Sequence, residues 1–126
     1  MRTDRSEEGF TLTELLAVVL IIGTLAAIAI PAFLHTRRGA YDDMMASDLR
    51  PAVSAELAYS ATNDTWTTEP ADLETEGYRI STGVTPVHVR LVGEAYVACV
   101  KHEAAAQWLV YDGASGTTSK SSSDCA

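Results

Sequence analysis

The chain has 126 residues, of which 47% are apolar, and a formal net charge of −8 at pH 7. This length accommodates one small domain rather than two. The acidic balance argues against a protein whose main task is to grip nucleic acid through phosphate contacts. The apolar residues are unevenly distributed: they occupy 17 of the 20 positions from Leu15 to Leu34. The composition therefore indicates a small domain attached to one apolar segment.

This apolar segment is long enough to span a membrane. No Asp, Glu, Lys or Arg occurs between Glu14 and Arg37, and twenty helical residues rise about 30 Å, the thickness of a bilayer core. A buried core helix is disfavoured because the segment is apolar all round and the rest of the chain is too small to enclose it. A cleaved secretory signal would have a shorter apolar stretch behind a basic head. We therefore predict a membrane-inserted helix.

Glu14 is the unusual residue at the start of this segment. A carboxylate in an apolar helix costs a few kcal/mol near the bilayer centre and less toward the interface. If the chain began at Phe10, Glu14 would lie in the first helical turn and interact favourably with the helix dipole. Alternatively, it pairs with a cation inside an assembly, and the new N-terminal ammonium of a neighbouring chain is the obvious candidate. Both explanations remain open at this point.

The residues from Gly9 to Leu16, Gly-Phe-Thr-Leu-Thr-Glu-Leu-Leu, the apolar run after them and Pro31 together carry a family resemblance. They closely resemble the processing and assembly segment of type IV pilins and related pilin-like proteins. The resemblance implies cleavage between Gly9 and Phe10 by a prepilin peptidase, N-methylation of Phe10 and an assembly role for Glu14. It also aligns Pro31 with the family's helix proline, which removes one backbone donor and should kink the helix.

Beyond Pro31, apolar residues recur at spacings of three and four, which predicts one long helix from Phe10 to about Ala61. Gly39 and Pro51 are weaker points within it. From Tyr78 the period changes to two, which predicts strands at Tyr78–Ile80, Val87–Leu91, Tyr96–Val100 and Trp108–Tyr111. The predicted fold class is α+β: a long N-terminal helix, membrane-spanning in its first half, packed on a small antiparallel sheet as in pilins.

The segment between helix and sheet, residues 59–77, reads as a connection with one short helical turn. We expect Thr67 or Thr68 to cap this turn, with Pro70 in its first turn. Trp66 and Leu73 are expected to fold back onto the long helix. Asn63 matches the glycosylation acceptor pattern, a short motif that often arises by chance.

The two cysteines are Cys99, inside a predicted strand, and Cys125, one residue from the end. Outside the cytoplasm they would form a disulfide that pins the Ser/Thr/Gly-rich tail from residue 114 to 124. In a reducing compartment they would stay free thiols. A C-terminal disulfide loop of this kind is common in type IV pilins. Two cysteines alone make a poor metal site.

We find no constellation of residues suited to catalysis. His35, His88 and His102 are scattered, and no motif of a hydrolase, phosphate-binding loop or metalloprotease is present. An acidic group reads as a solvated loop face rather than a calcium site; it comprises Glu69, Asp72, Glu74 and Glu76. We therefore expect a protein that is not an enzyme and has neither metal nor cofactor.

These observations predict three regions: a leader at residues 1–9, a transmembrane and filament-core helix at 10–34, and an extracytoplasmic head at 35–126. The expected function is that of a structural type IV pilus subunit, held in the cytoplasmic membrane and then polymerised into an extracellular filament. The expected partners are further copies of the chain, a prepilin peptidase, a membrane assembly platform with its ATPase, and lipid before assembly. Nucleic acid is not expected as a main ligand.

Two alternatives are kept. One is a pseudopilin of a type II secretion-like system, or a minor pilin. The other is an uncleaved single-span membrane protein with a small extracytoplasmic binding domain. The sequence does not distinguish among adhesion, motility, DNA uptake and secretion as the role of a filament.

Overall fold

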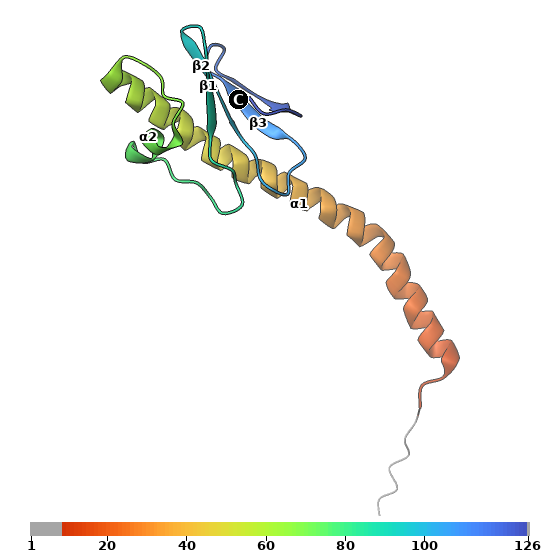
Figure 1. The fold of residues 1–126 in the computed structure, drawn as a ribbon. Helices are drawn as coiled ribbons and strands as arrows, with labels where there is room; N and C mark the ends of the chain where they lie inside the picture. The colour runs from red at the N-terminus through yellow and green to blue at the C-terminus, as the bar shows by residue number, and fades with distance from the viewer. Residues whose placement is uncertain (1–8, 126) are drawn as a thin grey trace, which may run out of the picture. The chain divides into compact units, whose positions relative to one another are not determined.

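A computed structural model describes residues 9–125, and the predicted leader lies almost wholly outside the described residues. The chain forms two compact units, one ending at Thr36 and the other beginning at Arg37. The described residues form two helices and four strands, whose arrangement can be followed in Figure 1. They are α1 (Leu12–Asn63), α2 (Pro70–Thr75), β1 (His88–Val92), β2 (Ala95–Val100), β3 (Trp108–Asp112) and β4 (Thr117–Ser121). The predicted α+β class is confirmed.

Helix α1 is continuous over 52 residues and passes through Pro31, Gly39 and Pro51 without a break. Its observed limits differ from the predicted ones by two residues at each end. Proline is tolerated here because the bonds on either side continue the helix around the one missing donor. The expected kink at Pro31 stays a prediction.

The second unit, which we call the head, places the C-terminal part of α1 against one face of the sheet. The four strands follow one another in the order β1-β2-β3-β4, and every neighbouring pair is antiparallel. The helix contributes its buried face to a single apolar core that it shares with the strands and α2. The central members are Met45, Leu49, Ala52, Leu73, Val87, Val89, Ala98 and Val100.

Polar contacts also fix the helix to the rest of the head. Asp48 is buried on α1, and its carboxylate accepts hydrogen bonds from the backbone N–H of Ser81 at 2.8 Å and from the Ser81 hydroxyl at 2.6 Å. Lys120 on β4 forms an ion pair with Asp42 on α1. The buried charge of Asp48 is thus compensated by two donors, as a buried carboxylate requires.

The predicted strand at Tyr78–Ile80 is wrong. These residues have no regular secondary structure. Tyr78 is buried in the core, whereas Ile80 is 38% exposed, so the apparent alternation does not describe one buried face. The burial alternation predicted for Val87–Leu91 also ends early. Val87, just before β1, and Val89 are buried, but Leu91 is 47% exposed because Leu91 lies close to the β1–β2 turn.

Strand β4 was not predicted, since its residues were read as part of a loose tail. The strand pairs with β3 over five residues, from Trp108 opposite Ser121 to Asp112 opposite Thr117. Its sequence, Thr-Thr-Ser-Lys-Ser, is exposed except at the partly buried Ser121. A polar edge strand of this kind shows no apolar alternation, so the period-two signal is absent although the backbone pairing is complete.

The connection after α1 matches the expectation in part. Leu73 is fully buried in the core. Helix α2 begins at Pro70 after Glu69, without a capping side chain at that position. Thr67 acts from further away: its hydroxyl accepts the Glu69 N–H at 3.0 Å and donates to Asp72 at 2.7 Å. Trp66 packs against Tyr96 of β2, so its ring contacts the sheet.

Candidate functional site

The first turn of α1 carries a reciprocal pair of contacts between Thr11 and Glu14. Oε2 of Glu14 accepts hydrogen bonds from the Thr11 backbone N–H at 2.9 Å and from the Thr11 hydroxyl at 2.8 Å. The Glu14 N–H in turn donates to the Thr11 hydroxyl oxygen at 3.2 Å. This is a capping box, in which two otherwise unpaired helix-terminal donors are satisfied.

The capping role of Thr11 was not predicted from the sequence. The signal was present, because a Thr followed three residues later by Glu, ahead of an apolar run, is the pattern of a capping box. Within the described part of the chain, both hydrogen bonds that the Glu14 carboxylate accepts end on Oε2.

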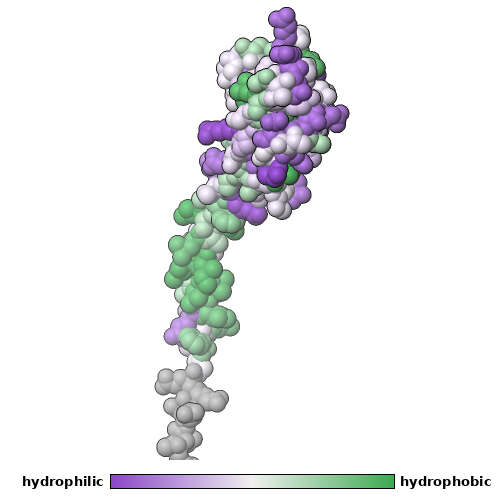
Figure 2. Space-filling view, turned by 90° about the vertical axis from the view of Figure 1, so that its left-hand side faces the viewer, coloured by the Kyte–Doolittle hydropathy of each residue, from purple (hydrophilic) through white to green (hydrophobic). Residues whose placement is uncertain are grey.

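The helix after this turn exposes apolar side chains along its whole surface. Leu25 is 63% exposed and Ile28 is 75% exposed, and Figure 2 shows hydrophobic residues over the visible face of this part of the chain. The one polar hydroxyl within the run, on Thr24, donates to the carbonyl of Ile21 at 2.8 Å, so it adds no unsatisfied donor. By length and composition the helix can cross a membrane. So large an apolar surface must be covered by lipid or by protein.

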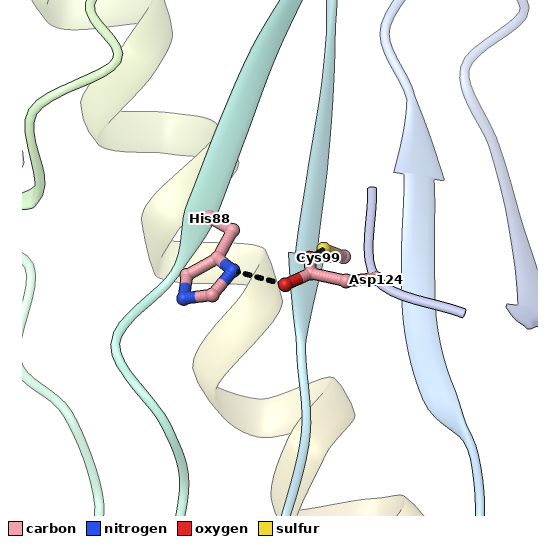
Figure 3. A group of neighbouring side chains, drawn as sticks. All are labelled: His88, Cys99 and Asp124. Carbon is pink, nitrogen blue, oxygen red and sulfur yellow. Dashed lines mark hydrogen bonds and ion pairs between the residues drawn. The ribbon is translucent and has the colours of Figure 1, made fainter. Parts of the chain in front are cut away.

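The C-terminal end of the chain is fixed to the sheet by a disulfide between Cys99 and Cys125. Both residues are buried, and their Cα atoms lie 6.1 Å apart. Beside them, Nδ1 of His88 and Oδ2 of Asp124 are 2.8 Å apart, as Figure 3 shows. Asp124 and Cys125 are thus held to the neighbouring strands by a covalent bond and by polar contacts.

The same corner contains a group of residue types that can bind metals. Ligand atoms of His88, Cys99 and Asp124 all lie within 4.8 Å of one another. The sulfur of Cys99, however, is bonded to Cys125, and only a thiolate is an effective metal ligand. The oxidised chain therefore offers one imidazole and one carboxylate here, and the arrangement serves to hold the C-terminal segment.

The remaining candidate residues do not converge. His102 is buried and stacks on Tyr41 with ring centroids 4.3 Å apart. His88 contacts Asp124, and His35 is exposed on α1. In the acidic group after α1, Asp72 accepts the hydroxyl of Thr67, and Glu69, Glu74 and Glu76 are exposed. These side chains stabilise local structure or face water.

Comparison with known proteins identifies the family. A family model described as the prokaryotic N-terminal methylation motif matches residues 4–30. The type IV wide pilus major component PilA4 of Thermus thermophilus is 33% identical over 105 residues, which cover 82% of this chain and 80% of the relative. The chain belongs to the type IV pilin family. The resemblance inferred from the sequence is confirmed.

Two further relatives each match a larger share of this pilin than of their own length. The type IV major pilin PilA of Myxococcus xanthus is 29% identical over 114 residues, covering 81% of this pilin and 52% of the relative. The type IV major α-pilin of Moraxella bovis is 44% identical over 57 residues, covering 45% of this pilin and 31% of the relative. The pilin family is structural.

Proposed function

We propose that this pilin is the structural subunit of a type IV pilus, polymerised through its N-terminal helix into an extracellular filament. The observation that carries the proposal is the exposed apolar surface of α1, joined to the methylation motif over residues 4–30. The relatives are major components of type IV pili by name. A helix that is apolar all round suits lipid before assembly and identical helices afterwards.

The proposed first step is cleavage between Gly9 and Phe10 by a prepilin peptidase, followed by N-methylation of Phe10. Both residues are exposed and precede the first residue of α1. No heavy atom outside the neighbouring residues lies within 4 Å of the position a Gly9 side chain would occupy. A peptidase can therefore approach this backbone closely. Cleavage leaves a chain that begins with an apolar residue and carries a new ammonium group.

In the proposed second step, Glu14 sets the position of each incoming subunit relative to its neighbour. Its Oε2 is held by Thr11, and its Oε1 faces no donor within the described first turn. The Phe10 ammonium of a neighbouring subunit fits this position. Two opposite unit charges about 4 Å apart attract by about 4 kcal/mol at an effective dielectric constant of ~20. This pairing would compensate a charge that is otherwise unfavourable in an apolar bundle.

The proposed third step is transfer of residues 10–34 from the cytoplasmic membrane into the filament core. The side chains that face lipid then face neighbouring helices, with small residues such as Gly23 and Ala27 allowing close approach. A membrane assembly platform and its ATPase are the expected partners, because extraction from lipid requires work. The predicted extracytoplasmic region, residues 35–126, would face outward with its disulfide loop.

The pseudopilin, the minor pilin and the uncleaved membrane protein remain the alternatives, and the names of the relatives favour the pilus subunit over all three. The deciding experiment is intact-mass and N-terminal analysis of chains recovered from sheared cell-surface filaments. We expect a mature chain that begins at N-methylated Phe10 as the main protein of those filaments. Chains that retain Met1, or filaments that lack this protein, would contradict the proposal.

A further inference from the structure

The head contains a groove between α1 and the last two strands. It has a volume of about 660 Å³ and lies between the α1 residues from Asp42 to Ser54 and the strands β3 and β4. The floor is apolar and comprises Ala46, Leu49, Val53, Leu109 and Tyr111. Such a hollow presents apolar surface to water, which favours a complementary occupant.

Two charges of opposite sign stand at the rim of this groove. Asp43 and Arg50 are seven residues apart on α1, so they lie on the same side of the helix about 10 Å apart along its axis. Both are exposed, and neither takes part in the ion pairs found among the described residues. Asp42, by contrast, is already paired with Lys120. The groove therefore offers an apolar floor flanked by one free anion and one free cation.

A second surface of the head has the complementary pattern. At the β1–β2 turn, Leu91 is 47% exposed and Val92 is 51% exposed, although both belong to a strand. They are flanked by the exposed side chains of Arg90 and Glu94. Gly93 has a φ of +64°, which permits the tight turn. We name residues 90–94 the hairpin tip; it projects an apolar pair between a cation and an anion.

We propose that the hairpin tip of one copy of this chain docks in the α1–β3–β4 groove of a second copy. Val92, which lies on the same strand face as Arg90, then covers the apolar floor, Arg90 lies opposite Asp43, and Glu94 lies opposite Arg50. The occupant is a second copy because the order of charge and apolar residues in the tip matches that of the groove. The proposal rests on the function proposed above and gives the filament a specific contact between heads.

The geometry of this contact agrees with open-ended growth. The tip and the groove share no residue, so the interface is heterologous: each copy donates its tip to one neighbour and its groove to another. A heterologous contact that does not close into a ring generates a helical filament. The contact would thus reinforce the assembly of the N-terminal helices and fix the neighbours of each head.

The test is a charge exchange in cells that make filaments of the wild-type chain. Asp43→Lys places two cations in contact, and Arg90→Glu places two anions in contact. We expect each variant alone to lower the mass of sheared filaments at least tenfold. The double variant, or the two single variants expressed together, should restore filaments to near the wild-type level. Glu76→Lys is the control, since Glu76 is exposed and lies outside both surfaces.

The outcomes separate this inference from the proposed function. If the wild-type chain is absent from surface filaments, the proposed function itself fails. If wild-type filaments form and both single variants assemble equally well, only the docking of tip and groove is overturned. Loss in the single variants without recovery in the exchanged pair also overturns it, once circular dichroism shows that the variant heads fold.

Discussion

The Glu56 carboxylate on α1 lies against the backbone of Thr67: its Oε2 accepts the Thr67 N–H at 3.3 Å, and its Oε1 is buried without a hydrogen-bond partner. Burial raises the pKa of Glu56 to about 6, the bond from Thr67 opposes this shift, and the nearby charge of Asp72 adds to it. The helix and the connecting segment thus meet at a carboxyl group that keeps its proton to a higher pH than a solvated glutamate does.

The raised pKa of Glu56 predicts that the free energy of unfolding of the head depends on pH. The folded head binds this proton more tightly than the unfolded chain, whose ordinary glutamate pKa is 4.5. Stability from this group is therefore fully present below about pH 4.5 and is lost as the pH rises through 6, by about 2 kcal/mol in all. We expect Glu56→Gln to raise the melting temperature at pH 7.5 and to leave it nearly unchanged at pH 4.

Because other carboxylates titrate in the same range, the comparison is the difference between variant and wild type at each pH, measured on the full chain in detergent. Glu76→Gln provides the control, since Glu76 is exposed on the connecting segment. A Glu56→Gln effect that is the same at both pH values would contradict the assignment.

A second prediction concerns two glycines with opposite surroundings. A Cβ on Gly113 would lie 2.7 Å from the backbone oxygen of Tyr96, whereas nothing lies within 4 Å of one on Gly39. The Gly113 N–H also donates to that Tyr96 oxygen at 2.8 Å. We expect Gly113→Ala to cost about 1–3 kcal/mol through this steric clash. Gly39→Ala, on the exposed surface of α1, should instead stabilise the chain by up to about 1 kcal/mol.

Chemical denaturation of both variants and the wild type would measure the two changes. If Gly113→Ala proves neutral, the close approach of the turn after β3 to β2 is not rigid in solution.

The sequence predicted those elements that have a regular period or a compact apolar run. Helix α1 places apolar residues at helical spacings, and β1 alternates apolar and polar residues. Strands β2 and β3 are short apolar runs bounded by turn residues. The predicted limits of all four lie within about two residues of the observed ones. Strand β4 lacked that signal because nearly all its side chains face water, although it pairs with β3 across a short local turn between Asp112 and Thr117. Tyr78–Ile80 had the signal by chance, since Tyr78 alone is anchored in the core.

In the candidate site, too, local features could be predicted from the sequence and long-range contacts could not. Glu14 and the apolar run are local features and could be recognised directly. The capping contact between Thr11 and Glu14 is also local, and its sequence signal is a Thr followed three residues later by a Glu. The approach of His88 to Asp124 joins residues 36 positions apart and depends on the sheet and the disulfide together. No local pattern encodes such a contact.

The disulfide supports a third prediction. Its two cysteines are 26 residues apart, and closing a loop of this length stabilises the folded state by about 3.5 kcal/mol in the chain-entropy model. We expect reduction, or Cys125→Ser, to lower the melting temperature of the head by at least about 10 °C. A reductant should have no further effect on the Cys125→Ser variant. Equal melting temperatures of the wild type under oxidising and reducing conditions would contradict the prediction.

The fourth prediction separates the capping role that the structure gives Glu14 from its proposed role in assembly. Glu14→Gln retains a side chain that can complete the capping box with Thr11, but it removes the charge. Thr11→Ala removes the capping hydroxyl, at a cost of about 1 kcal/mol to the helix end, and retains the charge. If pairing with a neighbouring ammonium drives registration, filaments should be lost in Glu14→Gln and retained in Thr11→Ala. Both chains should remain in the membrane fraction and fold normally.

The opposite pattern, with filaments from Glu14→Gln and none from Thr11→Ala, would assign Glu14 to helix capping alone. Filament mass after shearing, normalised to the membrane-bound subunit, is the measurement. A loss of Coulombic pairing worth about 4 kcal/mol corresponds to roughly a thousandfold change in the binding equilibrium. Even a partial loss of the pairing would therefore be visible in the filament yield. A weakened helix cap would change the yield little, because the 52-residue α1 helix continues for about 13 further turns that remain hydrogen-bonded.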